Sequence, residues 1–250
     1  MMHWERPHSE AFIEKHANNL DDDDWQNIVE HQKLSEPFIE RHAGDEMLWQ
    51  QISRYQKLSE AFIEKHADKV DWINISCYQE LSESFIEKHS DKVDWAWVSR
   101  YQKLSEKFIE KHSDKVNWRC ISKFQELSEP FIERYADKVD WDYISKFQEL
   151  SESFIKSHAD RMDWAVLAHN QELSNEFIAN NKHKFATEAG IYWLGLKKSI
   201  ADSKLYRDIV AEYEKKKRGD KHPKHWKIFW CVLAAVIAAV VVYAIKSMVG

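Results

Sequence analysis

Histidine, serine and aspartate, the residues of many hydrolytic and metal-binding sites, recur along this 250-residue chain at near-constant spacing. Six histidines each stand four residues after the phenylalanine of a Phe-Ile pair: His16, His42, His66, His89, His112 and His158. A column of imidazoles could bind a metal ion or respond to pH. However, Tyr135 takes the same position in one copy, and the helix dipole alone favours histidine at a helix C-terminus. We therefore interpret the histidines as structural.

No set of polar residues stands out as a nucleophile with its base. Serine and aspartate recur along the array at positions expected to cap helices, so no catalytic group is singular. The acidic run from Asp21 to Asp24 is interpreted as a solvated turn whose last residue caps a helix, because no second set of oxygen ligands accompanies it. Cys77, Cys120 and Cys231 are isolated, which predicts neither a disulfide framework nor a zinc site. We expect no enzymatic activity, no cofactor and no metal.

The chemistry-bearing residues belong to a repeated unit whose spacing settles at 23 residues. A Leu-Ser pair opens each unit, a Phe-Ile pair follows the serine, and a tryptophan comes later in the unit. The tryptophans are Trp25, Trp49, Trp72, Trp95, Trp118, Trp141 and Trp164. Their regular spacing on one helical face predicts a buried column rather than a ligand-stacking platform.

Each unit predicts two short helices. Serine is the expected N-cap of the first helix and is followed by glutamate, whose charge suits the helix dipole. Aspartate or asparagine precedes the tryptophan and should cap a second helix, which runs to the tyrosine or phenylalanine six residues on. We expect that final ring, such as Tyr78, to share the buried face with Trp72 and Ile75. Helices this short are not stable alone in water, so the units must stack.

The predicted fold class is all-α, an α-solenoid of two-helix repeats with a C-terminal single transmembrane helix. Apolar residues do not alternate with period two, which argues against strands. The expected domains are an N-terminal capping unit (1–33), the repeat array (34–178), a C-terminal helical cap (179–213), a basic juxtamembrane neck (214–227) and the transmembrane helix (228–245).

The positions where the repeats differ are candidates for recognition. The two residues after each tryptophan vary, and a partly conserved basic column stands beside them. Trp97 and Tyr143 offer large aromatic anchors of the kind that dominate protein interfaces. The candidate partner-binding residues are Asn74, Trp97, Arg100, Cys120, Lys123, Tyr143 and Lys146. An alternative, that these positions are unconstrained surface, stays open at this stage.

A membrane segment is predicted near the end of the sequence. Residues 228–245 contain no charged side chain, and an eighteen-residue helix is about 27 Å long. Residues 1–213 carry 28 Lys and Arg against 40 Asp and Glu, whereas residues 214–250 carry 8 against 2. The positive-inside rule then predicts a single-pass, tail-anchored protein with its N-terminal part in the cytosol. The candidate membrane-surface residues are Lys215, Lys216, Lys217, Arg218, Lys221, Lys224, Lys227, Trp226 and Trp230.

The repeated motifs LSExFIExH, DKVDW and ISxYQ resemble a short helical repeat found in proteins of giant DNA viruses and large phages. The resemblance covers about residues 34–178 and implies a viral source. The resemblance does not point to any particular biochemical activity.

These observations predict a scaffold that binds protein partners and holds them at a membrane, with lipid contacts through the basic neck and the apolar helix. The alternative is a structural viral protein that links a capsid, or a layer of its own copies, to a membrane. A homo-oligomer is compatible with either function. Nucleic acid is a less favoured partner because residues 1–213 are net acidic.

Overall fold

The computed structural model describes residues 4, 6–44, 46–201 and 203–219. All regular structure in these ranges is helical, which confirms the all-α prediction for this part of the chain. The chain divides into two compact units, residues 1–162 and residues 163–250.

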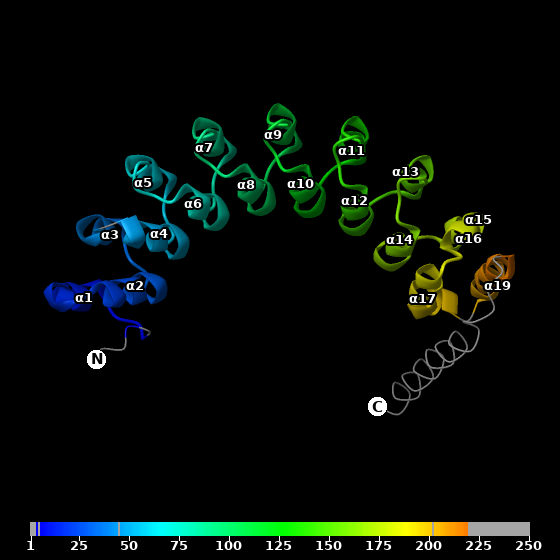
Figure 1. Ribbon diagram of the computed structural model, residues 1–250, viewed down its shortest axis with the longest axis horizontal. Helices are drawn as coiled ribbons and strands as arrows, with labels where there is room; N and C mark the ends of the chain where they lie inside the picture. Colours follow the sequence, from blue (N-terminus) through cyan, green and yellow to red (C-terminus); the bar gives the residue numbers. More distant parts are fainter. Residues whose placement is uncertain (1–3, 5, 45, 202, 220–250) are drawn as a thin grey trace, which may run out of the picture. The chain divides into compact units, whose positions relative to one another are not determined.

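Unit 1 is a series of short helices that alternate between two rows (Figure 1). The odd-numbered row contains α1 (Glu10–His16), α3 (Glu36–His42), α5 (Glu60–Lys65), α7 (Glu83–Lys88), α9 (Glu106–Lys111), α11 (Glu129–Arg134) and α13 (Glu152–Ser157). The even-numbered row contains α2 (Asp22–His31), α4 (Glu46–Tyr55), α6 (Trp72–Tyr78), α8 (Trp95–Tyr101), α10 (Trp118–Phe124) and α12 (Trp141–Phe147). A 3₁₀ turn, η1 (Ala17–Asn19), follows α1.

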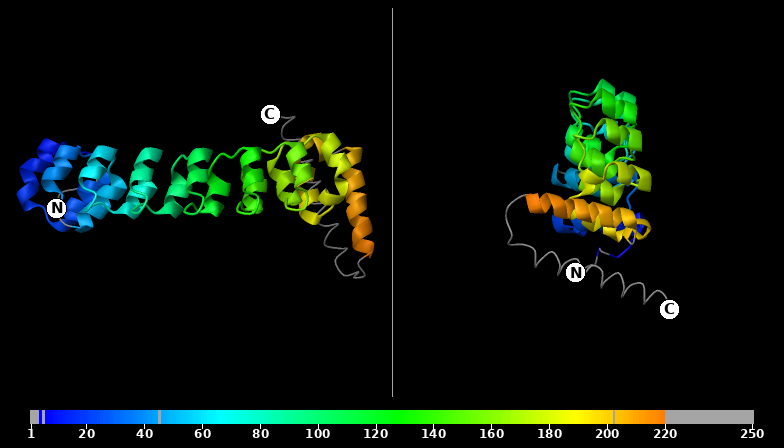
Figure 2. Two further views of the ribbon diagram at one scale, coloured as in Figure 1. Left: turned by 90° about the horizontal axis from the view of Figure 1, so that it is seen from above. Right: turned by 90° about the vertical axis from the view of Figure 1, so that its right-hand side faces the viewer.

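The even-numbered helices pack on one another in order from α2 to α12. Within unit 1 the rows curve so that this row lines the inner side and the odd-numbered row the outer side (Figure 1). A second view shows the helices of unit 1 side by side, with their axes across the direction in which the repeats follow one another (Figure 2). Each two-helix repeat therefore contacts mainly its neighbours, as in other solenoids.

The helix starts follow the predicted capping chemistry. Ser82 begins α7 by accepting a hydrogen bond from the Phe85 main-chain N–H at 3.2 Å. Asp94 begins α8 in the same way, accepting from Trp97 N–H at 3.1 Å. In the acidic run the cap differs from the prediction, because Asp21 rather than Asp24 is the N-cap of α2. Capping at the first aspartate lets the helix dipole act on all three acids that follow it.

A ladder of buried glutamines joins successive repeats. Gln79 Nε2 donates to the main-chain oxygens of Ser53 and Gln56 at 2.9 and 2.8 Å, and its Oε1 accepts from Leu58 N–H at 3.0 Å. The same set of bonds recurs at Gln102 and at the equivalent glutamines that follow: Gln125 and Gln148. These bonds satisfy carbonyl groups at helix ends that would otherwise be buried without partners.

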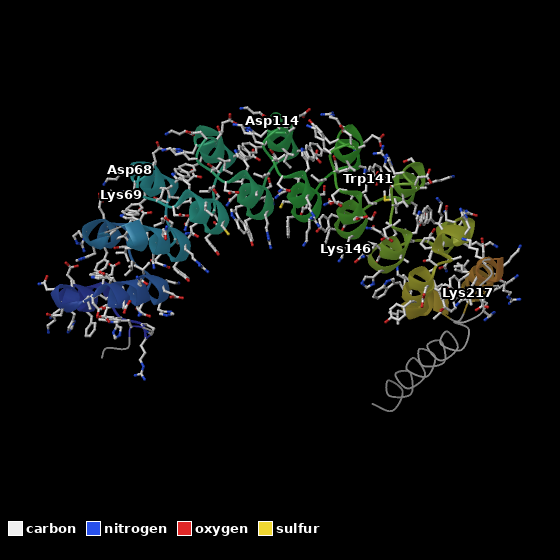
Figure 3. All side chains as sticks on the ribbon, in the orientation of Figure 1. Asp68, Lys69, Asp114, Trp141, Lys146 and Lys217 are labelled. Atoms are coloured by element: carbon white, nitrogen blue, oxygen red, sulfur yellow. The ribbon has the colours of Figure 1, made fainter. Side chains whose placement is uncertain are left out.

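The tryptophans pack between the two rows, but most of them are less buried than the sequence predicted. The ring of Trp118 lies 6.2 Å from Phe131 and 4.8 Å from Tyr135 of the next repeat, and its Nε1 donates to the Ser113 carbonyl at 2.9 Å. Figure 3 shows the equivalent Trp141 between the two rows. Most of these side chains are half-buried, whereas Trp49 is 3 % exposed.

The prediction that the last ring of each second helix joins the core is wrong. Tyr78 is 51 % exposed, while Ile75 and Ser76 on the same helix are fully buried. With about 100° between successive residues, Ser76 and Gln79 share the buried face with Trp72, and Tyr78 falls to one side of it. Small and amide side chains take the buried positions because the neighbouring main chain satisfies their polar groups.

Unit 2 contains six helices within its described residues: α14 (Trp164–Asn170), α15 (Asn175–Asn180), α16 (Lys182–Phe185), α17 (Glu188–Leu196), α18 (Lys198–Ala201) and α19 (Lys204–Gly219). Helix α17 packs on α14, and both α16 and α17 pack on α19. Thr187 and Ser203 accept hydrogen bonds from the main-chain N–H groups of Gly190 and Tyr206, near the starts of α17 and α19. The buried core of the unit includes Phe185 and Leu194.

None of the helices within the described ranges has the length and apolar character needed to cross a membrane. The predicted transmembrane helix, residues 228–245, lies outside the described residues.

Candidate partner-binding surface

The inner row of unit 1 carries a line of exposed aromatic rings with basic side chains beside them. We call this line the aromatic-basic stripe; its rings are Tyr55, Tyr78, Tyr101, Phe124 and Phe147, and its cations are Arg54, Arg100, Lys123 and Lys146. The exposed fractions of the rings range from 38 % to 51 %. Each ring ends an even-numbered helix, and each cation directly precedes a ring. Figure 3 shows Lys146 on this inner side and Asp114 on the opposite side.

The cations alternate in space with the rings. Arg100 Cζ lies 5.0 Å from the ring centre of Tyr101 and 5.1 Å from that of Phe124 in the next repeat. Lys123 Nζ lies 4.8 Å from Phe124 and 5.5 Å from Phe147. These distances are within the range of cation–π attraction, which holds the long basic side chains along the stripe.

The alternation has one interruption. Arg54 lies between Tyr55 and Tyr78, at 5.0 and 5.4 Å from their ring centres. The next basic position is occupied by Cys77, so no cation follows Tyr78. Burial raises the pKa of the Cys77 thiol and disfavours its thiolate at neutral pH.

The stripe cations differ from the outer-row cations in their partners. Within the described residues, none of Arg54, Arg100, Lys123 and Lys146 forms an ion pair with a carboxylate. On the outer row, basic side chains pair with glutamates of the preceding repeat: Lys65 with Glu40, Lys88 with Glu64, Lys111 with Glu87, and Arg134 with Glu110. The four stripe cations therefore lack the carboxylate partners that the outer-row cations have, whereas Arg119, also on the inner row, lies 3.9 Å from Asp140.

Further side chains widen the stripe. The Trp97 ring lies 5.6 Å from Tyr101 in a stacked arrangement. Tyr143 Oη accepts a hydrogen bond from Arg119 Nη2 at 3.0 Å, and this bond raises the pKa of the guanidinium. Lys123 Nζ also lies 5.4 Å from the Tyr143 ring. The result is a continuous surface of rings and cations from α8 to α12.

All seven predicted partner-binding residues lie on the inner row, on α6, α8, α10 and α12. Arg100 and Lys146 are exposed, and Trp97, Lys123 and Tyr143 are half-buried. The remaining two, Asn74 and Cys120, are half-buried as well. Asn74 Nδ2 donates to the Gln50 carbonyl at 3.3 Å, and burial raises the pKa of the Cys120 thiol.

The sequence interpretation missed the stripe rings because it assigned them to the core. A signal was present in the sequence, since every stripe ring directly precedes one of the ladder glutamines. Had the glutamine been placed on the buried face, the ring before it would have been turned outward by about 100°.

The histidine column lies on the outer row, and four of its members contact a glutamate of the preceding repeat: His42, His89, His112 and His158. His89 Nε2 lies 2.6 Å from Glu64 Oε2, and His112 Nε2 lies 2.7 Å from Glu87 Oε2. The pKa of Glu64 is lowered by its bonds to Lys88 and His89. Among the residues that the structure describes, no group of three or more His, Cys, Asp or Glu side chains is arranged to hold a metal ion.

The predicted membrane-surface residues fall in two places. Lys215, Lys216, Lys217 and Arg218 form the end of α19 in unit 2. Lys216 Nζ donates to the His183 carbonyl at 2.6 Å, and Arg218 lies 3.9 Å from Glu214. The others, Lys221, Lys224, Trp226, Lys227 and Trp230, lie outside the described residues.

Comparison with protein-family models, with curated proteins and with solved structures finds no match to this chain. Membership of a viral helical-repeat family therefore stays a prediction from the repeated sequence motifs.

Proposed function

We propose that unit 1 is a protein-binding scaffold whose recognition surface is the aromatic-basic stripe, and that the chain holds its partners at a membrane. The observation that supports recognition is the contrast between the two rows. Outer-row cations such as Lys88 are paired with carboxylates, whereas the stripe cations lie beside exposed rings without such partners.

The composition of the stripe fits a protein interface. Aromatic and arginine side chains contribute a large share of the binding energy in protein complexes. The helix dipole accounts for the basic residue in the last turn of α4, α8, α10 and α12. It does not account for five rings that stay 38 % to 51 % exposed. A partner that covers these rings would remove apolar surface from water.

The membrane part of the proposal rests on the sequence. Residues 228–245 have the composition of a transmembrane helix, and the basic residues before them suit an anionic lipid surface. Tethering to a membrane raises the effective concentration of a bound partner for other proteins at that membrane.

Proximity labelling with the full chain tests both parts. The test variant is Arg100→Glu/Lys123→Glu on the stripe, and its matched control is Lys88→Glu/Lys111→Glu on the outer row. We expect the stripe variant to lose a defined set of labelled proteins that the control retains, with both variants in the membrane fraction. Equal labelling by the two variants would contradict the recognition surface. Deletion of residues 228–250 should release the chain from the membrane fraction, and retention would contradict the anchor.

A further inference from the structure

We propose that the stripe binds an acidic protein segment in extended conformation, with a carboxylate at about every third residue. This inference rests on the proposed function and names the chemistry of the partner. The charge of the inner row supports it first. On the five helices that carry the stripe (α4, α6, α8, α10 and α12), two acidic residues, Glu46 and Asp142, stand against five basic residues: Arg54, Arg100, Arg119, Lys123 and Lys146. Of the five, Arg119 lies 3.9 Å from Asp140.

The spacing of the stripe favours an extended chain. Because Arg100 lies within about 5 Å of the ring centres of both Tyr101 and Phe124, these rings are at most about 10 Å apart, which is also the usual spacing of packed helices. An extended segment of the polyproline type advances about 3.1 Å per residue and completes one turn in three residues. Three residues of a bound segment therefore match one repeat, and every third side chain returns to the face that meets the cations.

The rings between the cations suit the other residues of such a segment. Tyr101 and Phe124 present apolar faces that are 50 % and 41 % exposed. Aromatic-lined grooves bind polyproline-type segments because these are already extended and lose little entropy on binding. Proline or aliphatic residues between the carboxylates would pack on the rings, while the carboxylates reach the cations on either side.

A single-stranded nucleic acid fits the same surface less well. Stacking platforms for bases also combine rings with cations. However, one cation per about 10 Å is sparse for a chain that carries a charge on every nucleotide. Residues 1–213 as a whole carry 40 acidic against 28 basic residues, which opposes a long polyanion more than a short acidic segment.

The ends of the stripe set the length of the segment. In α2 the two positions that correspond to a stripe cation and ring are Glu30 and His31, so the stripe begins at α4. It ends in unit 1 with Phe147 of α12. Five rings at about 10 Å intervals match a segment of about a dozen extended residues.

Fluorescence polarisation with the detergent-solubilised full chain tests the inference. The probe is a labelled fifteen-residue peptide of five Glu-Pro-Ala repeats. The control peptide has the same composition and net charge, but its five glutamates are contiguous. We expect the periodic peptide to bind at least about fivefold more tightly, because only it places a carboxylate beside each cation.

Two variants connect the binding to the stripe. Arg100→Gln/Lys123→Gln should weaken binding of the periodic peptide about tenfold, since two charge contacts at the surface are lost. The matched outer-row variant, Lys88→Gln/Lys111→Gln, should change the affinity less than about twofold. If thermal melting shows that the stripe variant is unfolded, Lys146→Gln provides a single exposed substitution with the same expected direction.

The inference is overturned if the two peptides bind with equal affinity, if the stripe and outer-row variants weaken binding equally, or if a labelled oligothymidine shows tighter stripe-dependent binding. If proximity labelling depends on the stripe but neither peptide binds, only this inference fails. If the labelling does not depend on the stripe, the proposed function itself fails.

Discussion

Gln102 Oε1 accepts a hydrogen bond from the main-chain N–H of Leu81, 2.9 Å away in the preceding repeat. The same side chain donates from Nε2 to the carbonyl oxygens of Ser76 and Gln79, at 3.0 and 2.7 Å. One buried amide therefore fixes three main-chain groups of its neighbour. These hydrogen bonds hold neighbouring repeats together in addition to the apolar packing. Without the glutamine, each of the three main-chain groups would be buried without a partner.

We predict that Gln102→Leu lowers the free energy of unfolding by about 3 kcal/mol, because it leaves one N–H and two carbonyl groups unsatisfied. Urea unfolding followed by circular dichroism measures the change. Lys103→Ala, at the exposed next position, is the control and should change stability by less than about 0.5 kcal/mol. A loss below about 1 kcal/mol for the leucine variant would show that water replaces the glutamine.

The buried glutamines also explain why some features of the fold could be predicted from the sequence and others could not. Ser82 and Asp94 cap helices through bonds to residues within three positions, so local chemistry was enough to place them. Gln102 is buried because of groups 21 to 26 positions away, which no local pattern shows. Once the glutamines and serines are placed inside, rings such as Tyr101 must face outward. The basic column of the candidate site was visible from residue type alone, whereas its aromatic half was hidden by this assignment.

The aromatic residues packed between the rows and those exposed on the stripe should respond differently to truncation. We predict that Trp118→Ala lowers the free energy of unfolding by about 3 kcal/mol, because the ring fills the space against Phe131 and Tyr135. Phe124→Ala, on the stripe, should cost less than about 1 kcal/mol because its ring is 41 % exposed. Chemical unfolding of both variants checks the difference. Equal losses would mean that the stripe ring is part of the core.

A close backbone approach should make one glycine of unit 2 sensitive to substitution. A Cβ atom at Gly190 would lie 3.0 Å from Thr187 Oγ1 and within van der Waals overlap of the Phe185 carbonyl oxygen. We predict that Gly190→Ala lowers the free energy of unfolding by about 1–3 kcal/mol, since the main chain must move. Gly44→Ala, where nothing lies within 4 Å, is the control and should not destabilise the protein. A melting temperature unchanged by Gly190→Ala would show that the main chain at the start of α17 moves without cost.

The end of α19 provides a test of the lipid-facing prediction. Lys215 and Arg218 are exposed in the last turn of this helix. With residues 228–250 deleted, we predict that Lys215→Gln/Arg218→Gln weakens co-sedimentation with phosphatidylserine vesicles about thirtyfold, at about 1 kcal/mol for each of the two basic residues near the surface. Lys204→Gln/Arg207→Gln, at the other end of α19, is the matched control and should have little effect. Equal weakening by both pairs would mean that the attraction is a general effect of net charge.

The histidine column should give one repeat a distinct response to acid. His66 is 8 % exposed and its Nε2 lies 3.8 Å from Glu40 Oε1, too far for the hydrogen bond that His89 makes. Burial lowers the pKa of His66, with partial opposition from Glu40. The folded state therefore binds the proton less well than the unfolded state, so stability falls as pH drops below the ordinary histidine value of about 6.5.

We predict that His66→Tyr reduces the fall in melting temperature between about pH 7.5 and 5.5, because tyrosine stays neutral throughout this range. Tyrosine should fit, since Tyr135 occupies the same position between Trp118 and Phe131. The lowered pKa of Glu64 and Glu87 affects stability only as the pH falls through the carboxyl range below about 4.5, outside this window. The exposed His31→Gln variant is the control and should show the same change of melting temperature with pH as the wild type. An unchanged slope in His66→Tyr would show that the buried imidazole gains a proton without cost, through movement of Glu40 into contact.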